Sequence, residues 1–388
     1  MKNLLNRLII IVFLCFTFVF CSIAQDDQSF LNPPQLIYHP SSVDGYKPES
    51  RKFTGISSIA VSPKGKIWAI WYAGKSSDED KNNYVVISTS RDKGNTWQEI
   101  MVIDPDRDGP VRAFDPELWV DPKGKLWAFW TQSVDHIGTI AGVWSMTTKN
   151  PDSESPKWSD PKRLTNGIMM CKPVVLSTGE WVLPASTWKL TDYSAKMIIS
   201  KDKGKSWKER GAVNVPKEAR TFDEHMIIEK KDKSLWMLVR TTYGIGESTS
   251  TNGGTSWSPL VPSKIKHPSA RFFIRRLNSG NLLLVKHGPI NMETGSSNLM
   301  AFISIDDGES WSKGLLIDER PGVSYPDGQQ ISDGQIFITY DYNRTKEQYI
   351  LMTCFTEKDI LSNNYDSKIV DVFSQKKIIS NGGNADKK

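Results

Sequence analysis

The sequence predicts an all-β protein that forms a single six-bladed β-propeller. Two observations lead to this prediction. An eight-residue turn pattern that ends in Trp occurs four times, and a second kind of turn occurs six times at nearly even spacing. Short strands that recur with a period of about 40–50 residues are typical of propeller blades.

The composition is that of a strand-rich globular chain. The 388 residues include 14 Trp, 11 Tyr and 15 Phe, too many aromatic side chains for a disordered protein. The 27 Gly and 21 Pro supply turns. A net charge of +5 is weak and the basic residues are scattered, so nucleic acid is not expected as a partner.

The eight-residue pattern reads Ser-x-Asp/Asn-x-Gly-x-Thr/Ser-Trp. The Asp or Asn favours a side-chain-to-backbone turn, and the Gly suits the positive φ that follows it. We expect the Trp to fill the space between neighbouring sheets. A degenerate copy is expected around Asp152–Trp158. The four clear copies are Ser90–Trp97, Ser200–Trp207, Ser250–Trp257 and Ser304–Trp311.

The second kind of turn counts the blades independently, because each copy precedes a strand that opens with an aromatic or aliphatic residue. Successive copies are 59, 55, 55, 46 and 54 residues apart. Six such units use almost the whole chain, so we predict one propeller over residues 25–373 and a polar tail over 374–388. The residues at these turns are Gly65, Gly124, Gly179, Ser234, Gly280 and Gly334.

The first 24 residues are interpreted as a secretory signal peptide. Lys2 and Arg7 precede an apolar run, Leu8–Cys21, that is too short to cross a bilayer comfortably. Small residues lead up to Ala24, where we place the cleavage site. This pattern predicts export to the periplasm or the extracellular space, with a lipid anchor at Cys21 as an alternative.

Two cysteines, Cys171 and Cys354, remain after cleavage. Two cysteines do not make a disulfide framework, so we expect two buried thiols, with one bridge as an alternative. No pair of cysteines has zinc-site spacing and no HExxH motif occurs, so neither a metal nor another cofactor is expected. The chain is expected to be a monomer.

The turn positions also predict a binding site. In a propeller, the first strand of each blade lines the central channel, and ligands bind at one mouth of that channel. Counting back seven to ten residues from each turn reaches the start of this strand, and five of the six residues found there are polar or ionisable. Such a ring is a concave site with convergent polar groups. The ring consists of Gly55, Asp115, Lys172, His225, Arg271 and Tyr325.

A second group of candidates lies on or just after the second strand of the later blades. Arg240 follows an apolar run, so an inward-facing guanidinium there needs an anionic partner. The other substrate-binding candidates are Tyr243, Lys286, His287 and Tyr340. The remaining histidines, His39, His136 and His267, are expected on the surface.

The eight-residue pattern resembles the Asp-box, or BNR, motif of sialidase-like propellers. That resemblance implies three arginines that hold a carboxylate, a Tyr–Glu nucleophile pair and an aspartic acid. Tyr325 matches the nucleophile, while Arg240 and Arg271 match two of the arginines. An acid is available in Asp78–Asp80. The first-strand Arg-Ile-Pro motif is absent, since the chain has Gly55-Ile56-Ser57 there, and no counterpart of the glutamate is found at Leu235 or Trp236.

The predicted ring has no obvious pair of carboxylates, which ordinary glycoside hydrolysis requires. It suits elimination next to a uronate carboxylate. A cation such as Arg271, Arg240 or Lys172 neutralises the carboxylate, neutral His225 takes the C5 proton, and Tyr325 protonates the departing oxygen. A mouth that closes around one sugar favours the end of an oligosaccharide, which makes loss of the C4 hydroxyl the expected reaction.

The chain also resembles a secreted branch of these proteins from polysaccharide-utilising bacteria, the ulvan oligosaccharide dehydratases. The resemblance lies in stretches such as Arg112–Pro116, Thr221–His225 and Val323–Gly328. It implies dehydration of a terminal uronate to its 4,5-unsaturated form, with an acidic oligosaccharide from a sulfated polysaccharide as substrate. An exo-glycosidase of sialidase type and a non-catalytic carbohydrate-binding propeller are the alternatives.

Overall fold

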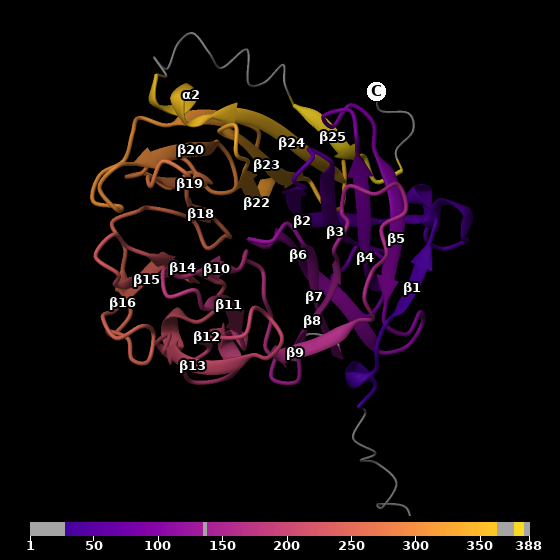
Figure 1. Ribbon diagram of the computed structural model, residues 1–388, viewed down its shortest axis with the longest axis horizontal. Coiled ribbons are helices and arrows are strands. Elements are labelled where there is room, and N and C mark those ends of the chain that lie inside the picture. Colours follow the sequence, from indigo (N-terminus) through magenta and orange to yellow (C-terminus); the bar gives the residue numbers. More distant parts are fainter. Residues whose placement is uncertain (1–27, 135–137, 363–375, 384–388) are drawn as a thin grey trace, which may run out of the picture.

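The computed structural model describes residues 28–134, 138–362 and 376–383. Within these ranges the strands form six antiparallel sheets, and each sheet is built from consecutive strands, apart from one strand added at an outer edge. The sheets follow one another around a central axis (Figure 1). The predicted six-bladed propeller is therefore confirmed.

Each blade contains four strands in chain order, and blade 1 carries a fifth on its outer edge. Blade 1 contains β2 (Phe53–Val61), β3 (Ile67–Gly74), β4 (Asn83–Ser90) and β5 (Gln98–Asp104), with β1 (Gln35–Tyr38) paired to β5. Blade 2 contains β6 (Val111–Val120), β7 (Leu126–Val134), β8 (Gly142–Thr148) and β9 (Lys162–Asn166). Blade 3 contains β10 (Val174–Val175), β11 (Trp181–Ser186), β12 (Ala195–Ser200) and β13 (Lys208–Val213).

The second half of the chain repeats this arrangement. Blade 4 contains β14 (His225–Glu229), β15 (Leu235–Thr241), β16 (Gly244–Ser250) and β17 (Val261–Pro262). Blade 5 contains β18 (Phe273–Arg276), β19 (Leu282–His287), β20 (Leu299–Ser304) and β21 (Leu315–Asp318). Blade 6 contains β22 (Val323–Gln330), β23 (Gln335–Tyr342), β24 (Tyr349–Thr356) and β25 (Lys377–Ser380).

The helical elements are short. The single α-helix described, α2 (Glu357–Leu361), follows β24 and is capped by the Thr356 hydroxyl, which accepts from the Asp359 N–H. The 3-10 turns are η1 (Ser29–Leu31), η2 (Pro40–Ser42), η3 (Pro48–Ser50), η4 (Trp188–Leu190) and η5 (Lys217–Ala219).

The Asp-box turns join the third and fourth strands of blades 1, 3, 4 and 5. In blade 1, Asp92 Oδ1 accepts from the Thr96 N–H at 2.9 Å, and Ser90 Oγ accepts from the Gly94 N–H at 2.8 Å. These bonds hold Gly94 at a φ of 84°, as the motif predicts. Equivalent bonds recur around Asp202, Asn252 and Asp306.

The Asp-box glycines also seat side chains of the preceding blade. A Cβ at Gly204 in blade 3 would lie 2.7 Å from the Trp127 ring of blade 2, and one at Gly308 in blade 5 would lie 2.8 Å from the Trp236 ring of blade 4. Glycine is therefore needed for close packing as well as for φ. This contact explains part of the high Trp content, because Trp127 and Trp236 follow blade turns.

The six blade turns join the first and second strands of every blade, as predicted. Five have a glycine with φ between 78° and 92°. In blade 4 the residue in this conformation is Lys233, with a φ of 72°, and the predicted Ser234 follows it. The left-handed position is therefore one residue earlier than the sequence pattern placed it.

Both ends of the described chain complete outer edges of blades, through β1 in blade 1 and β25 in blade 6. The sequence predicts a polar tail over 374–388, whereas Lys377–Ser380 pair with β24. Part of the predicted tail therefore belongs to blade 6. The predicted signal peptide, 1–24, lies outside the described residues.

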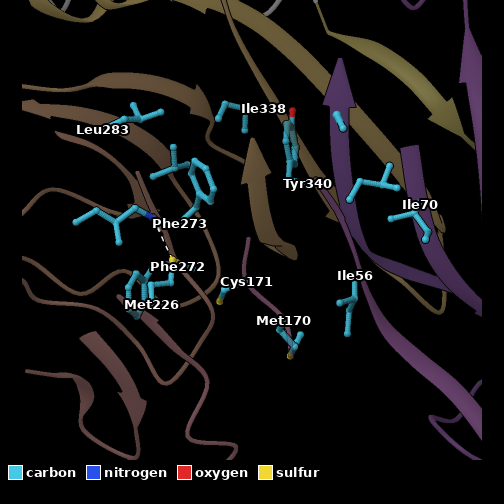
Figure 2. Close-up of a cluster of buried hydrophobic side chains, with 14 of the residues drawn as sticks. Ile56, Ile70, Met170, Cys171, Met226, Phe272, Phe273, Leu283, Ile338 and Tyr340 are labelled. Carbon is cyan, nitrogen blue, oxygen red and sulfur yellow. Dashed lines mark hydrogen bonds between the residues drawn. The ribbon is translucent and has the colours of Figure 1, made fainter. Parts of the chain in front are cut away.

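The largest group of buried apolar side chains extends from between the blades to the axis. Met170, Cys171, Met226 and Phe272 belong to it and are labelled in the close-up of Figure 2. Cys171 is buried, Cys354 is partly buried, and both thiols are free. The expectation of unpaired cysteines is therefore confirmed.

Candidate functional site

A cavity of 740 Å³ opens at one mouth of the propeller. The first strand of each blade begins at this mouth and the second strand ends there, so all six blades contribute to its wall. The lining includes Phe53, Ile56, Asp78, Glu79, Asp115, Met170, Trp188, Phe222, Glu224, Arg240, Ser296, Ser324, Tyr325, Asn343 and Arg344. This is the predicted mouth, with a wall of both aromatic and charged side chains.

A bulge shared by three inner strands presents residues to the cavity. The pairing of β2, β6 and β22 with their neighbours shifts register at equivalent positions. The bulged residues Ile56, Asp115 and Tyr325 have φ values of 57°, 48° and 51°, and all three line the cavity. Bulges re-aim side chains next to functional sites. In blade 1 the residue at this position is Ile56, whereas counting back along the sequence predicts Gly55.

Tyr325, Arg240 and Glu224 form a connected group in the wall. Arg240 Nη1 donates to Glu224 Oε1 at 3.0 Å and to the Tyr325 hydroxyl at 3.2 Å. The other carboxylate oxygen of Glu224 is buried and has no partner within the described chain. Burial, followed by the charge of Glu224, raises the pKa of Tyr325 above its ordinary value, so its hydroxyl is protonated at neutral pH.

A second arginine enters the cavity from the loop after β23. Arg344 Nη1 lies 3.2 Å from Glu79 Oε1, and its guanidinium lies 5.0 Å from the centre of the Tyr325 ring. The side chain passes over Gly55, where a Cβ would overlap with its Cγ and Cδ atoms. Gly55, a member of the predicted ring, therefore contributes space that Arg344 occupies.

Asp115 adds a buried carboxyl group to the same wall. Burial raises its pKa well above the ordinary value, and the charges of Glu79 and Glu224 raise it further. Glu79 also accepts from the Tyr72 hydroxyl at 2.7 Å. The cavity thus combines a carboxyl group whose pKa is raised by burial with carboxylates paired to arginines.

Lys172 and Arg271 lie deeper along the axis than predicted. Lys172 Nζ contacts Glu117 Oε1 at 2.8 Å and Asp327 Oδ2 at 2.7 Å, and Arg271 Nη2 lies 3.3 and 3.5 Å from the same two carboxylates. All four side chains are buried, and none lines the cavity. We call Lys172, Arg271, Glu117 and Asp327 the axial cluster. Its two cations are balanced by two carboxylates, so it supports the site from below.

The predicted base, His225, does not reach the cavity. Its side chain is 2% exposed, and its ring nitrogens lie 3.1 Å from Asp223 O and 2.8 Å from Lys196 O. Burial lowers its pKa. The residue that lines the cavity at this point is the preceding one, Glu224.

Four further candidates also lie away from the cavity lining. Lys286 donates to the carbonyl groups of Gly288 and Pro289, and the Tyr340 hydroxyl donates to Asp318 at 2.9 Å. Tyr243 is 44% exposed on the outside. His287 Nδ1 lies 3.2 Å from His267 Nε2, and both rings are 2% exposed or less.

The three histidines expected on the surface have different positions. His267 is buried, which corrects the expectation for this residue. His39 is exposed, and His136 lies outside the described residues.

Sequence reasoning missed several residues of the cavity, among them the charged side chains of Glu224 and Arg344. Glu224 directly precedes His225, which is the residue that counting back from the blade turn selects. The sequence feature that could have identified Glu224 is its spacing from Arg240. The end of β15 lies beside the start of β14, and the Arg240 N–H donates to Glu224 O at 2.7 Å. Arg344 comes from a loop, where strand periodicity carries no information.

Comparison with known proteins agrees with this geometry. The family model described as a BNR repeat-like domain matches residues 65–338, more than half of the chain, so the chain belongs to this family. A search of curated protein sequences finds no match. No described helix is long and apolar enough to span a membrane. The described ranges also contain no group of three His, Cys, Asp or Glu residues arranged to hold a metal ion.

Solved structures show the same fold. The Hadza microbial sialidase Hz136 aligns with 81% of this chain and 68% of its own, at a TM-score of 0.64 and 18% identity. The intramolecular trans-sialidase from Ruminococcus gnavus aligns with 85% of this chain and 98% of its own, at 0.63 and 15%. A protein of unknown function from Dyadobacter fermentans DSM 18053 aligns with 81% and 94%, at 0.60 and 17%.

Proposed function

We propose that the protein is an enzyme that acts on the terminal acidic sugar of an oligosaccharide. The observation that carries this proposal is the connected group of Tyr325, Arg240 and Glu224 in the cavity wall. It combines a hydroxyl, a cation and a carboxylate at the closed end of a cavity that fits a small ligand. The sialidases of similar fold support a carbohydrate substrate by analogy.

Two arginines are suited to hold the sugar's carboxylate. Arg240 and Arg344 both line the cavity, and both lie against Tyr325, one at its hydroxyl and one over its ring. Guanidinium groups bind carboxylates with two parallel hydrogen bonds. Phe222 and Trp188 add apolar surface for the sugar ring.

Hydrolysis is the reaction that these residues support best. The Tyr325 oxygen attacks the anomeric carbon while its proton passes to Glu224, whose second oxygen has no partner in the described chain. Asp115, which holds its proton because it is buried, protonates the departing oxygen. Water then attacks the anomeric carbon and breaks the sugar–tyrosine bond. The proton of this water passes to Asp115, and Glu224 returns its proton to the Tyr325 oxygen. This reaction corresponds to an exo-glycosidase of sialidase type, the alternative to elimination that the sequence also suggests.

Elimination of water from a terminal uronate is the second candidate. The Tyr325 hydroxyl lies against Arg240, and the C5 proton of a bound uronate is next to the carboxylate that Arg240 would neutralise. A cavity carboxylate, Glu224, takes this proton, the C4–O bond breaks, and Tyr325 protonates the departing hydroxyl to give water. The sequence resemblance to ulvan oligosaccharide dehydratases favours this route, with Glu224 in the role first assigned to His225.

One experiment separates the candidates. The protein is incubated with oligosaccharides that end in glucuronate or in N-acetylneuraminate, and the products are weighed by mass spectrometry. Two fragments indicate hydrolysis, whereas loss of one water mass with a new ultraviolet absorption indicates elimination. Tyr325→Phe should stop either reaction, and His225→Gln serves as the matched control outside the cavity. Binding without any product would leave a carbohydrate-binding propeller and overturn the enzymatic proposal.

A further inference from the structure

A second cavity, of 520 Å³, lies at the opposite mouth of the propeller. Its wall contains the last residues of inner strands, such as Val120 of β6, Glu229 of β14 and Arg276 of β18. The first cavity lies at the beginnings of these strands. The axial cluster lies between the two mouths, so the second cavity is a separate site.

The charge of this cavity is strongly positive. Its wall contains one carboxylate, Glu229, whose oxygens are occupied by the Ser177 hydroxyl and N–H at 2.7 and 2.8 Å. The cationic side chains in the wall are Lys230, Lys231, Lys233, Arg275 and Arg276. An imbalance of this kind inside a concave wall concentrates a positive potential.

Most of these cations already have a partner. Arg276 Nη1 lies 2.8 Å from Asp307 Oδ1, Lys230 lies 3.9 Å from Glu309, and Lys231 Nζ donates to Ile305 O at 2.8 Å. Arg275 differs, because its one hydrogen bond within the described chain runs from Nη1 to Pro173 O at 2.6 Å. No carboxylate of the described residues lies within ion-pair distance of it.

Arg275 is partly buried, and it has no ionic partner among the described residues. Burial lowers its pKa, and the carboxylates that act on it at longer range, Asp327 and Glu117, are already engaged by Lys172 and Arg271. Buried charges in proteins are normally paired with an opposite charge. The open space next to this guanidinium is the cavity itself.

The rest of the wall is apolar. Trp119, Val174 and Ile228 line it beside Arg275. Trp119 is held edge-on against Trp181, with ring centres 4.8 Å apart, which fixes its position. A ligand with one anionic group and a compact apolar or sugar-like body would satisfy both parts of this wall.

We propose that this second cavity binds a small ligand through an oxyanion group, a sulfate or phosphate ester or a carboxylate, which Arg275 receives. Lys233 is exposed in the wall of this cavity, its ammonium group makes no ion pair or hydrogen bond among the described residues, and it adds long-range attraction. The site is independent of the proposed catalytic chemistry, because none of its residues lines the first cavity.

The test measures binding of inorganic sulfate, inorganic phosphate and acetate by calorimetry at constant ionic strength, using chloride as the reference anion. Wild-type protein should bind at least one of the three, and Arg275→Met should weaken that binding roughly tenfold or more, since a charge-assisted bond is lost. Arg107→Met, at an exposed arginine remote from this cavity, is the matched control and should bind as wild type does. Glucose 6-sulfate, glucose 6-phosphate and glucuronate then identify which oxyanion the cavity prefers.

Thermal unfolding provides a second readout. Without the anion, Arg275→Met should raise the melting temperature, because it removes a partly buried charge that has no ionic partner among the described residues, and the anion should stabilise wild type more than this variant. If Arg275→Met does not fold, Lys233→Ala should weaken binding more modestly. Equal binding by wild type and Arg275→Met, or no binding of any of the three anions by wild type, would overturn the proposal.

Discussion

Because Arg344 packs over Gly55, adding a single methyl group at residue 55 tests the proposed carboxylate-binding role of Arg344. In Gly55→Ala the new Cβ would overlap with Cγ and Cδ of Arg344. Gly55 is not among the residues with positive φ, so alanine suits its backbone. The added methyl group should therefore displace the Arg344 side chain and leave the fold intact.

The magnitude follows from the bond that is lost. A hydrogen bond to a charged group contributes about 1.5–3 kcal/mol, which corresponds to roughly 10–150-fold in affinity. If Arg344 binds the substrate's carboxylate, Gly55→Ala should weaken binding by an amount in this range. Arg344→Ala should cost about the same, because each change removes the same guanidinium from the cavity.

The assay is a double-mutant cycle with calorimetric binding of glucuronate and N-acetylneuraminate. Once Arg344 is alanine, its Cγ and Cδ no longer lie over Gly55, and the next nearest atom is Asp341 Oδ2, which would lie 3.1 Å from the new Cβ. The double variant should therefore bind no worse than Arg344→Ala alone. Additive losses would show that Gly55 acts by another route, and full affinity in Gly55→Ala would refute the steric argument.

Three further predictions concern the same molecule. Tyr325→Phe should lower turnover by roughly a hundredfold or more and leave substrate affinity nearly unchanged, as kcat and a calorimetric Kd would show. Asp115→Asn should lower turnover by roughly 10²–10⁴-fold, yet raise stability at neutral pH. The reason is that a carboxyl group whose pKa is raised on folding makes the folded protein less stable once the pH exceeds the pKa of that group in the unfolded chain. Melting temperatures measured at several pH values would record this difference. His287 has a pKa lowered to about 4 by burial, so the unfolded chain binds more protons between about pH 4 and 6.5 and stability should fall on acidification through that range. His287→Asn should flatten this slope in urea unfolding at several pH values, whereas an unchanged slope would assign the effect to other groups.

The fold was predictable because its signals are local. An Asp-box turn is fixed by bonds between residues a few positions apart, such as Asp92 and Thr96, so the motif alone specifies it. The blade turns are equally local, and the one inexact position, Lys233, shows that a non-glycine residue can take the left-handed conformation. Regular spacing then gave the number of blades without any long-range information.

The site was predictable only in part because it depends on register and on distant contacts. Counting back along a strand assumes an uninterrupted alternation of side chains, and the bulges at Ile56, Asp115 and Tyr325 break it. In blade 4 an error of one residue exchanged a cavity carboxylate, Glu224, for the buried ring of His225. The position of Arg344 depends on Gly55, a residue of another blade, because only glycine leaves room for the arginine side chain there. No local sequence pattern encodes such a contact between distant residues.

The way in which Arg240 is bonded decides whether the first cavity can accept a carboxylate at all. Its Nη1 already donates to Glu224 and Tyr325, so a substrate carboxylate needs other N–H groups of this guanidinium. A guanidinium has five N–H groups, and among the described residues the Arg240 side chain, which lines the cavity, donates from Nη1 only. A substrate carboxylate can therefore bind beside the existing bonds without breaking them. In the proposed reaction Glu224 keeps Arg240 and Tyr325 in place, so the Tyr325 hydroxyl is aligned before the substrate carboxylate binds.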